Sequence, residues 1–486
     1  MKVRLLYKDR KLKLCDTDTP VRQALKEDLG LDKIFEVMAD GNKEILKIVE
    51  SVFLDSLTSK QDILYRQAVL KDCMTYPKTV RALYQMLNEA VTCWKKNGWC
   101  FFSSNAGNRF YGSVKTLQFY HDYLIRLRQI ADENSDKFQS EGFKSLFEEI
   151  KQQLDDPFLE DSRSLLNELE FKDGMIMELK LGKDNRTSGY TLVRKNSKKF
   201  RMRWAFAPCY TLAGEDDAGE KDLSGRCSQA YFKSVDILWE AANNIDDYLK
   251  SIQEETAFYI GALTLLEKMK EKDIPYSIPD LSDTMSRKYT DLRDLYLALQ
   301  TEKCVGNDLD EKEKSLYIIT GANQGGKTTF LRSVGQAQVM FQSGLFIAAS
   351  YASLPVSQGI FTHFKREEDD QMKRGKLEEE LQRLDQIVPL LRQGSLILFN
   401  ESFSSTNERE GSRICGQITE ALKENQIEQF HVSHLYSFSH GFFEKNMKDA
   451  CFLRAERKED GSRSFHLDKG EPQKTAYGKD LFYSSI

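Results

Sequence analysis

The chain has 486 residues, of which 40% are hydrophobic and 30% are charged, and only 9 are prolines. This composition is typical of an ordered globular protein of about three domains and excludes an intrinsically disordered chain. The formal net charge of −5 gives no overall signature of nucleic-acid binding, so contact with DNA would depend on a local basic patch or on encirclement.

The cysteines and the N-terminus bear on where the protein works. The 9 cysteines include no Cys-x-x-Cys pair and no neighbouring histidine cluster, as is common for free or buried thiols in a reducing compartment. Residues 1–10 are charged and lack an apolar signal core, and no apolar run approaches the roughly 18 residues of a membrane helix. We therefore expect a soluble cytoplasmic protein with no membrane partner.

Most of the first third of the chain has helical periodicity. After a short N-terminal strand or arm over residues 1–20, apolar residues recur at three- and four-residue spacing through 21–155, for example in 45–57 and 117–127. The pattern predicts a helical region.

The pattern then changes to strands. Residues 175–181 and 190–194 predict two strands joined by a turn over 182–189. The acidic, glycine-bearing segment 214–222 predicts a loop. A long helix is expected to resume at Tyr231.

Residues 320–329, Thr-Gly-Ala-Asn-Gln-Gly-Gly-Lys-Thr-Thr, have the spacing of a P-loop. The apolar run 316–320 predicts the strand before such a loop, and 329–340 predicts the helix after it. In a P-loop, backbone N–H groups surround the phosphates, Lys327 reaches the β- and γ-phosphates, and the Thr328 hydroxyl binds Mg²⁺. A glycine-rich turn before a helix is the alternative, but the Lys-Thr pair and both flanks favour a nucleotide site. The residues expected to bind the nucleotide are Gly321, Asn323, Gly325, Gly326, Lys327, Thr328 and Thr329.

The wider string is more specific than a general P-loop. Residues 321–332, Gly-Ala-Asn-Gln-Gly-Gly-Lys-Thr-Thr-Phe-Leu-Arg, resemble the loop of the MutS mismatch-repair ATPases, Gly-Pro-Asn-Met-Gly-Gly-Lys-Ser-Thr-(Tyr/Phe)-(Met/Leu)-Arg. Asn323 and the double glycine are the distinguishing features. MutS proteins are ABC-type ATPases, which hydrolyse ATP at sites shared by two dimerised nucleotide-binding domains. The resemblance therefore implies ATP and Mg²⁺ as cofactors and a homodimer formed through the ATPase domain.

A second strand is expected to supply the catalytic acid. Residues 395–401, Ser-Leu-Ile-Leu-Phe-Asn-Glu, are apolar up to their polar end, as in a buried parallel strand. The resemblance places Glu401 where the family's glutamate orients the attacking water, and Asn400 where the family has an aspartate that helps hold Mg²⁺. An amide lacks the charge of a carboxylate, so we expect weaker Mg²⁺ binding, more reliance on Thr328 and slow ATP hydrolysis. A strand-end turn is the alternative; it is disfavoured because 402–411 resembles the family segment that faces the partner subunit.

A histidine follows a third predicted strand. His434, in Gln-Phe-His-Val-Ser-His, matches the family's histidine that senses the γ-phosphate. His431 is expected on the opposite face of the strand as a structural residue. A metal site made of these two histidines would lack a third ligand.

Two segments between the nucleotide motifs also resemble the family. Residues 359–370 resemble its "D-x-I-F-T-R-x-G-x-x-D-D", and 374–383 take the place of its signature "S-x-F-x-x-E". Gly375 replaces the signature serine, but its N–H at a helix N-terminus can still face the partner's γ-phosphate. A solvated charged face is the alternative for this run. Together with Gly375, Ser405 and Thr406 are expected to face the partner subunit.

Weaker matches extend the resemblance to about residues 21–481. They concern the helical core, its returning helix, a segment near the adenine base, the closing strand and the "SYG" turn, at residues 62–69, 258–267, 305–308, 465–470 and 475–478. The family's C-terminal dimerisation helices are expected to be missing or reduced.

Together these features predict an α/β ABC-type P-loop ATPase domain preceded by a mostly α-helical MutS-like core and lever region with a small β-containing clamp-like insertion. The expected ranges are an N-terminal arm, the helical core, the insertion, the returning helices and the ATPase domain, at residues 1–20, 21–155, 156–230, 231–300 and 301–486.

A basic run in the expected insertion is the candidate DNA-contacting surface. Residues 194–204 carry six cations and no acid, with Phe200 and Trp204 among them, and cations of this kind would neutralise phosphates independently of sequence. A solvated strand face is the alternative. The candidate DNA-binding residues are Arg194, Lys195, Lys198, Lys199, Arg201 and Arg203.

The resemblance implies a MutS-like ATPase that binds DNA as a nucleotide-gated dimeric clamp, in repair or recombination without intrinsic mismatch reading. Mismatch reading in the family uses an N-terminal domain with a Phe-x-Glu wedge, and a helical core that starts by about residue 21 leaves no room for it. Two alternatives stay open. One is a weakly hydrolysing, nucleotide-gated scaffold for a protein or ribonucleoprotein, favoured by Asn400, Gly375 and the acidic balance. The other is a mismatch-binding repair protein proper.

Overall fold

A computed structural model of the chain describes ten stretches, which are residues 3–15, 19–97, 106–172, 175–182, 187–193, 211–213, 216–322, 324–366, 375–457 and 463–473. The chain divides into two compact units. Unit 1 comprises 1–5 and 78–256, and unit 2 comprises 6–77 and 257–486. No helix in these stretches is both long enough and apolar enough to cross a membrane.

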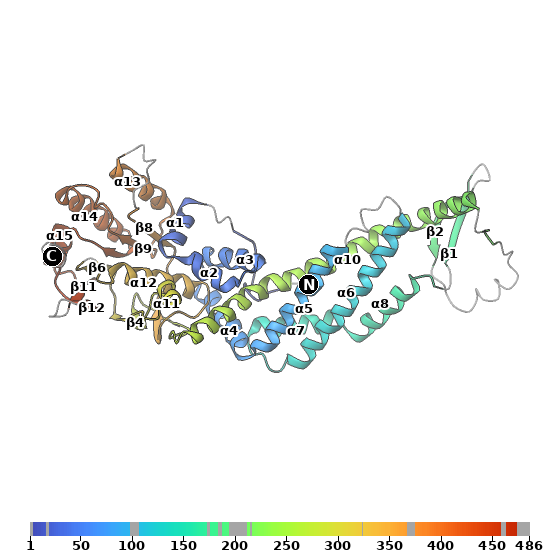
Figure 1. The fold of residues 1–486 in the computed structure, drawn as a ribbon, viewed down its shortest axis with the longest axis horizontal. Coiled ribbons are helices and arrows are strands. Elements are labelled where there is room, and N and C mark those ends of the chain that lie inside the picture. Colours follow the sequence, from blue (N-terminus) through green and yellow to red (C-terminus); the bar gives the residue numbers. More distant parts are fainter. Residues whose placement is uncertain are drawn as a thin grey trace. The chain divides into compact units, whose positions relative to one another are not determined.

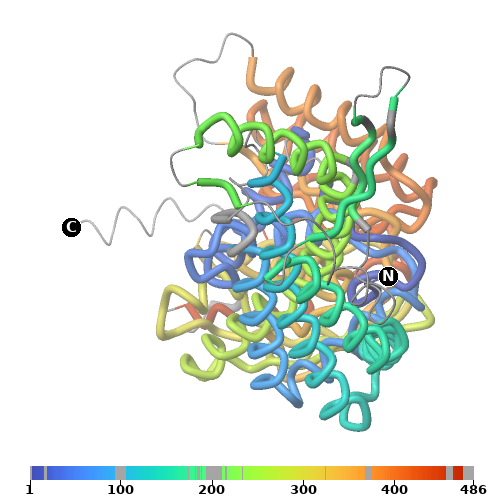
Figure 2. Tube along the Cα trace, turned by 90° about the vertical axis from the view of Figure 1, so that its right-hand side faces the viewer, coloured from blue at the N-terminus to red at the C-terminus, as the bar shows by residue number. Residues whose placement is uncertain are grey.

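Unit 1 is mainly helical. Its helices are α6, α7 and α8, most of α5 and the first part of α10, with bounds Ala106–Asn134, Glu141–Gln153, Asp156–Glu168, Pro77–Asn97 and Asp217–Glu271. Side chains at the N-caps fix where two of them begin, because Ser140 Oγ accepts from Phe143 N and Asp155 Oδ1 accepts from Phe158 N. Helix α6 lies beside α7 and α8, and α6 and α7 can be followed in light blue and blue-green (Figure 2).

The predicted hairpin is present in unit 1. Strands β1 (Ile176–Leu181) and β2 (Thr187–Val193) pair antiparallel. Leu192 packs with the buried Phe110 of α6 and Tyr231 of α10. The second strand begins three residues earlier than predicted.

The loop prediction for 214–222 is wrong from residue 217 onward, because α10 already begins at Asp217. The acids that favoured a loop by composition, Asp217 and Glu220, lie in the first helical turn. There they face the positive end of the helix dipole, which favours acidic side chains.

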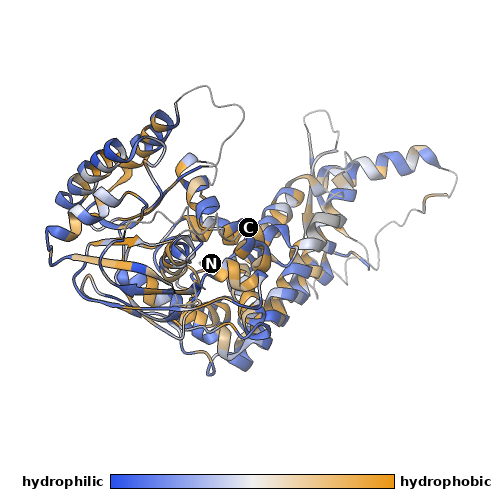
Figure 3. Cartoon of the chain, turned by 60° about the vertical axis from the view of Figure 1, so that its left-hand side comes forward, coloured by the Kyte–Doolittle hydropathy of each residue, from blue (hydrophilic) through white to orange (hydrophobic). Residues whose placement is uncertain are grey.

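The N-terminal part of unit 2 is also helical. Its four helices α1, α2, α3 and α4 have the bounds Pro20–Asp28, Leu31–Ala39, Lys43–Leu54 and Lys60–Thr75. Amphipathic spacing gives α2 and α3 a buried apolar row, for example Ile34, Phe35 and Met38 in α2. Figure 3 shows hydrophobic residues in orange and hydrophilic residues in blue interspersed along the helices of the chain.

Unit 2 also contains two sheets. The six-stranded sheet has the order β12-β11-β6-β10-β9-β8, with bounds Arg463–Lys469, Ala450–Arg457, Leu316–Thr320, Glu428–Val432, Leu396–Asn400 and Ile360–Phe364. Its strands are parallel except for β12. The four-stranded sheet has the order β3-β7-β4-β5, with bounds Asp280–Leu281, Tyr351–Leu354, Arg287–Leu292 and Asn307–Glu311.

Helices cover both faces of the six-stranded sheet, and these are α12, α13, α14 and α15, with bounds Lys327–Gln342, Lys376–Ile387, Glu408–Glu424 and Tyr436–Glu444. The last three share a core with Ile397 and Phe399 of β9, while α12 lies on the opposite face (Figure 1). There Gly335 approaches Leu398 so closely that a Cβ would lie 2.7 Å from it. The strands β6, β8, β9 and β10 are buried on both faces, which explains the largely apolar sequences of β6, β8 and β9.

The short elements α11 (Leu295–Gln300) and η2 (Val388–Leu390) complete the structure. The chain is therefore a mixed α/β protein in which helices precede a mainly parallel sheet, as expected from the sequence.

Candidate functional site

A glycine-rich turn connects β6 to α12 at the carboxyl end of the central strand. Gly321 has φ +122° and Gly326, the N-cap of α12, has φ +89°, and both values favour glycine. A Cβ at Gly325 would lie 2.8 Å from the Ala455 Cβ and 3.0 Å from the Ala322 carbonyl. The turn can therefore close around a ligand only with glycine at these positions, and it presents a helix N-terminus to an anion.

Lys327 is the first residue of α12 and is only 4% exposed. Its Nζ donates to the carbonyls of Gly321 and Ala322, each at 2.8 Å. Burial lowers its pKa to about 8, although attraction to Glu401 opposes the change. A bound phosphate could take over these hydrogen bonds and restore the full charge.

Thr328 and Asn400 meet at the ends of α12 and β9. The Thr328 hydroxyl donates to Asn400 Oδ1 at 3.0 Å. Both groups offer the oxygen ligands that Mg²⁺ prefers, but neither is charged. No cluster of three or more His, Cys, Asp or Glu side chains that could hold a metal ion occurs in the described stretches. A Mg²⁺ ion at Thr328 and Asn400 would therefore need oxygen ligands from nucleotide phosphates.

Glu401 follows β9 and pairs with His434, which follows β10. His434 Nε2 lies 3.0 Å from Glu401 Oε1, and this hydrogen bond lowers the pKa of Glu401 below its usual range. The Glu401 backbone has φ +54°, and its N–H donates to the Val432 carbonyl at 2.8 Å. The carboxylate is thus ionised and held by a neighbouring strand, as a group that orients water must be.

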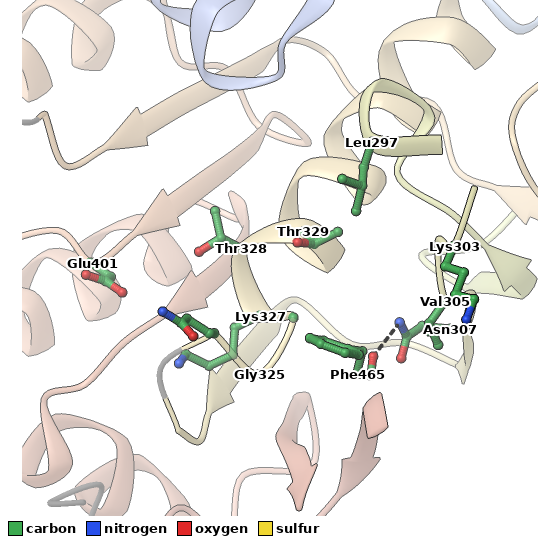
Figure 4. A pocket seen from close by; sticks show the side chains of 12 residues that line it. Leu297, Lys303, Val305, Asn307, Gly325, Lys327, Thr328, Thr329, Glu401 and Phe465 are labelled. Carbon is green, nitrogen blue, oxygen red and sulfur yellow. Dashed lines mark hydrogen bonds between the residues drawn. The ribbon is translucent and has the colours of Figure 1, made fainter. Parts of the chain in front are cut away.

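These groups border a cavity of about 520 Å³, within the usual size of small-molecule sites. Lys327 and Glu401 lie toward one end, and Leu297, Val305 and Phe465 lie toward the other (Figure 4). Asn307 Nδ2 donates to the Phe465 carbonyl at 3.2 Å, and Asn307 Oδ1 accepts from Leu467 N at 2.9 Å. The cavity therefore has Lys327 and Glu401 toward one end and apolar side chains, together with Lys303 and Asn307, toward the other.

Sequence reasoning missed four of the residues that line the cavity, namely Leu297, Lys303, Gln324 and Phe465. The segment 465–470 was predicted only as a closing strand, and Phe465 does lie in β12. Its φ of +61° and its 44% exposure place the ring at the cavity. An aromatic residue in the last strand was the only signal in the sequence, and the backbone twist that turns it inward has no sequence pattern.

Of the predicted site residues, several line this cavity directly, namely Gly325, Gly326, Lys327, Thr328, Thr329 and Glu401. Asn400 and His434 reach it through hydrogen bonds to Thr328 and Glu401. Asn323 and the basic residues Arg194, Lys195, Lys198, Lys199, Arg201 and Arg203 lie outside the described stretches.

The predicted partner-facing residues lie away from the cavity lining. Gly375 is the exposed N-cap of α13, with open space around its Cα. The Ser405 hydroxyl donates to the Glu380 carboxylate, and the Thr406 hydroxyl donates to Glu410 at 2.6 Å.

His431 is buried in β10, where Nε2 lies 3.1 Å from Gln429 Oε1. Burial lowers its pKa to about 3, so the ring is neutral. This environment fits the predicted structural role.

Comparison with known proteins identifies related families over most of the chain. A family model described as the MutS2 N-terminal domain matches residues 58–272, and one described as MutS domain V matches 317–479.

Individual relatives are similar over shorter stretches. Endonuclease MutS2 of Thermus thermophilus is 35% identical over 136 residues, which are 27% of this chain and 18% of the relative. DNA mismatch repair protein MutS of Fervidobacterium nodosum is 30% identical over 172 residues, 34% of this chain and 21% of the relative. MutS protein homolog 4 of Homo sapiens is 28% identical over 166 residues, 34% of this chain and 18% of the relative. The chain thus spans about a fifth of the length of these relatives.

Proposed function

Because the chain belongs to the MutS family, we propose that it is an ATPase that couples its nucleotide state to DNA binding, in repair or recombination. The observation that supports this best is the convergence of Lys327, the Thr328–Asn400 pair and the Glu401–His434 pair beside one cavity. In this proposal residues 301–486 form an ABC-type P-loop ATPase domain. The ranges 1–20, 21–155, 156–230 and 231–300 are the arm, helical core, clamp-like insertion and returning helices.

ATP binding would use the two ends of the cavity. The loop amides and Lys327 would bind the phosphates, with Lys327 exchanging its two carbonyl partners for phosphate oxygens. Phe465 and Val305 would contact the base at the apolar end. The combination explains why one cavity has both a cationic and an apolar wall.

Mg²⁺ would be held by the Thr328 hydroxyl and Asn400 Oδ1 together with nucleotide phosphates, and it would neutralise phosphate charge. Because Asn400 is neutral, the protein would contribute less to Mg²⁺ affinity than a carboxylate would. This is the structural basis for proposing slow hydrolysis.

Hydrolysis would depend on Glu401. Its carboxylate is ionised and half-buried, so it can orient and polarise a water molecule. Since His434 Nε2 contacts the same carboxylate, His434 would sense the γ-phosphate by moving between these two anions. The presence of the γ-phosphate would then make or break the hydrogen bond between His434 and Glu401.

A homodimer formed through the ATPase domain would complete the site. Gly375, Ser405 and Thr406 are the residues proposed to face the partner's nucleotide, and the exposed N-cap position of Gly375 supports this role. The DNA-contacting surface is proposed at the basic run 194–203. The dimer would thus act as a nucleotide-gated clamp on DNA.

The coupling is tested by measuring duplex DNA affinity with ATP, with ADP and without nucleotide. The expected result is a change of at least about fivefold with nucleotide state in the wild-type protein and no change in Lys327→Ala. Equal affinity in all three states would contradict the proposal. Affinities for mismatched and perfect duplex are expected to be equal, and tighter binding of the mismatch would instead favour a mismatch-binding repair protein.

A second candidate is a nucleotide-gated scaffold that scarcely hydrolyses ATP and holds a protein or ribonucleoprotein partner. The neutral Thr328–Asn400 pair favours it. The substitution Asn400→Asp separates the two functions, because it restores a negative ligand without adding volume. A large rise in turnover would identify attenuated hydrolysis, whereas unchanged turnover would show that another feature limits the rate.

A further inference from the structure

The segment after β9 is held in a strained conformation close to the proposed catalytic acid. Glu401 has φ +54° and Phe403 has φ +60°, a region that non-glycine residues adopt only when their surroundings hold them there. The Phe403 carbonyl also lies against α14, since a Cβ at Gly411 would be 2.4 Å from it. Small movements of this segment would therefore be transmitted to Glu401.

A buried glutamate of α13 anchors the segment. Glu380 is only 4% exposed, and its two carboxylate oxygens have different partners. Oε2 accepts from the backbone N–H of Phe403, and Oε1 accepts from the Ser405 hydroxyl. A buried carboxylate with both oxygens satisfied fixes its partners firmly, because losing it would leave their N–H and O–H groups unpaired.

His363, in β8, links α13 to the segment after β9 through hydrogen bonds. Its Nε2 lies 2.9 Å from the Glu380 carbonyl, and its Nδ1 lies 2.7 Å from Ser402 Oγ. Burial lowers its pKa to about 4, so the ring is neutral at physiological pH. Because a carbonyl can only accept, the Nε2 that faces the Glu380 carbonyl carries the proton. The ring also stacks on Phe403, with centroids 5.4 Å apart.

From these contacts we propose that Glu380 is a positioning residue that ties Glu401 to helix α13, so that ATP hydrolysis follows the placement of this helix. The inference rests on the proposed function, in which Gly375 at the start of α13 faces the partner's nucleotide. Helix α13 would then contact the partner's nucleotide through Gly375, and through Glu380 it would hold the segment that follows Glu401 in its own site. Nucleotide bound at one composite site would set the geometry of the acid at the other.

The geometry distinguishes two substitutions of Glu380. In Glu380→Gln, the amide oxygen can accept from Phe403 N–H while the amide N–H donates to Ser405 Oγ, so both anchors remain. In Glu380→Ala both are lost. Asp385→Asn is the matched control, because Asp385 lies on the same helix, is exposed, and loses the same charge.

The first measurement is steady-state ATP turnover by the full chain, together with ATP affinity. Glu380→Ala is expected to lower kcat by at least about tenfold while ATP affinity stays within about threefold, since misplacing a reacting group costs rate and not ground-state binding. Glu380→Gln and Asp385→Asn are expected to stay within about threefold of the wild-type kcat. A folded Glu380→Ala protein with wild-type kcat would overturn the proposal, as would equal losses in the Gln and Ala variants.

Hydrogen–deuterium exchange provides a readout that does not require turnover. Exchange in the peptide covering 401–406 is expected to rise in Glu380→Ala and to stay protected in Glu380→Gln. Ser405→Ala removes one anchor only, and it should raise exchange to an intermediate level even if Glu380→Ala does not fold. Unchanged exchange in both Glu380→Ala and Ser405→Ala would overturn the proposed role of Glu380. A wild-type protein without turnover would instead contradict the proposed ATPase while leaving this test of Glu380 intact.

Discussion

The buried Lys327 of the proposed P-loop should make the proposed nucleotide binding depend on pH. Burial lowers the pKa of Lys327 from 10.5 to about 8, so the free protein loses this proton as the pH rises through about 8. The negative phosphates of a bound nucleotide would raise the pKa again. Binding should therefore take up a proton in the window between this lowered value and the usual lysine range.

The magnitude follows from the lowered value. If binding restores full protonation, proton uptake is expected to be ~0.1 at pH 7, ~0.5 at pH 8 and ~0.9 at pH 9. The same linkage predicts that affinity falls ~tenfold between pH 7 and pH 9, or ~1.4 kcal/mol.

Calorimetric titration with a non-hydrolysable ATP analogue, in two buffers of different ionisation enthalpy at each pH, measures this uptake. Lys327→Met is the control and should bind more weakly, without the additional proton uptake at pH 9. The reasoning would be refuted by wild-type binding that takes up no proton at pH 9, or by the same uptake in Lys327→Met.

Three further predictions concern turnover, the base end of the cavity and stability. Glu401→Gln should lower kcat by ~100-fold or more with little change in ATP affinity, because only the water-orienting group is lost; a kcat within a few-fold of wild type in a turnover assay would contradict this role. Phe465→Ala should weaken ATP binding by ~1–3 kcal/mol while tripolyphosphate binding stays the same, because ATP has a base that can stack on the ring and tripolyphosphate has none. Equal losses of affinity for both ligands would contradict stacking of the base on Phe465. Arg287→Met should lower the free energy of unfolding by ~3–5 kcal/mol in urea denaturation, because it leaves the buried Glu428 without its bidentate partner. The double variant with Glu428→Gln should recover part of this loss, and no recovery would argue against the ion pair as the cause.

The sequence predicted the elements of the proposed phosphate-binding half of the site because a P-loop depends on local spacing. A strand, a glycine turn and a helix are contiguous there. The strand has the predicted bounds 316–320, and the helix begins at Lys327, two residues before its predicted start. Glu401 was predicted as the end of an apolar strand, and it directly follows β9 in the structure.

Other features depend on contacts between distant segments and therefore had no local signal. Phe465 reaches the cavity by a backbone twist in β12, and Glu380 meets Phe403 across 23 residues of sequence. The start of α10 at Asp217 was missed because acidic residues and glycine favour a loop by composition, whereas the same acids stabilise a helix N-terminus.

The most direct test of the proposed function is ATP turnover by the purified chain, measured without DNA and with duplex, branched and single-stranded DNA. Glu401→Ala serves as the inactive control. We predict turnover that rises with at least one form of DNA and disappears in the variant. Measurable ATP binding without turnover on any DNA would contradict the ATPase and favour the nucleotide-gated scaffold.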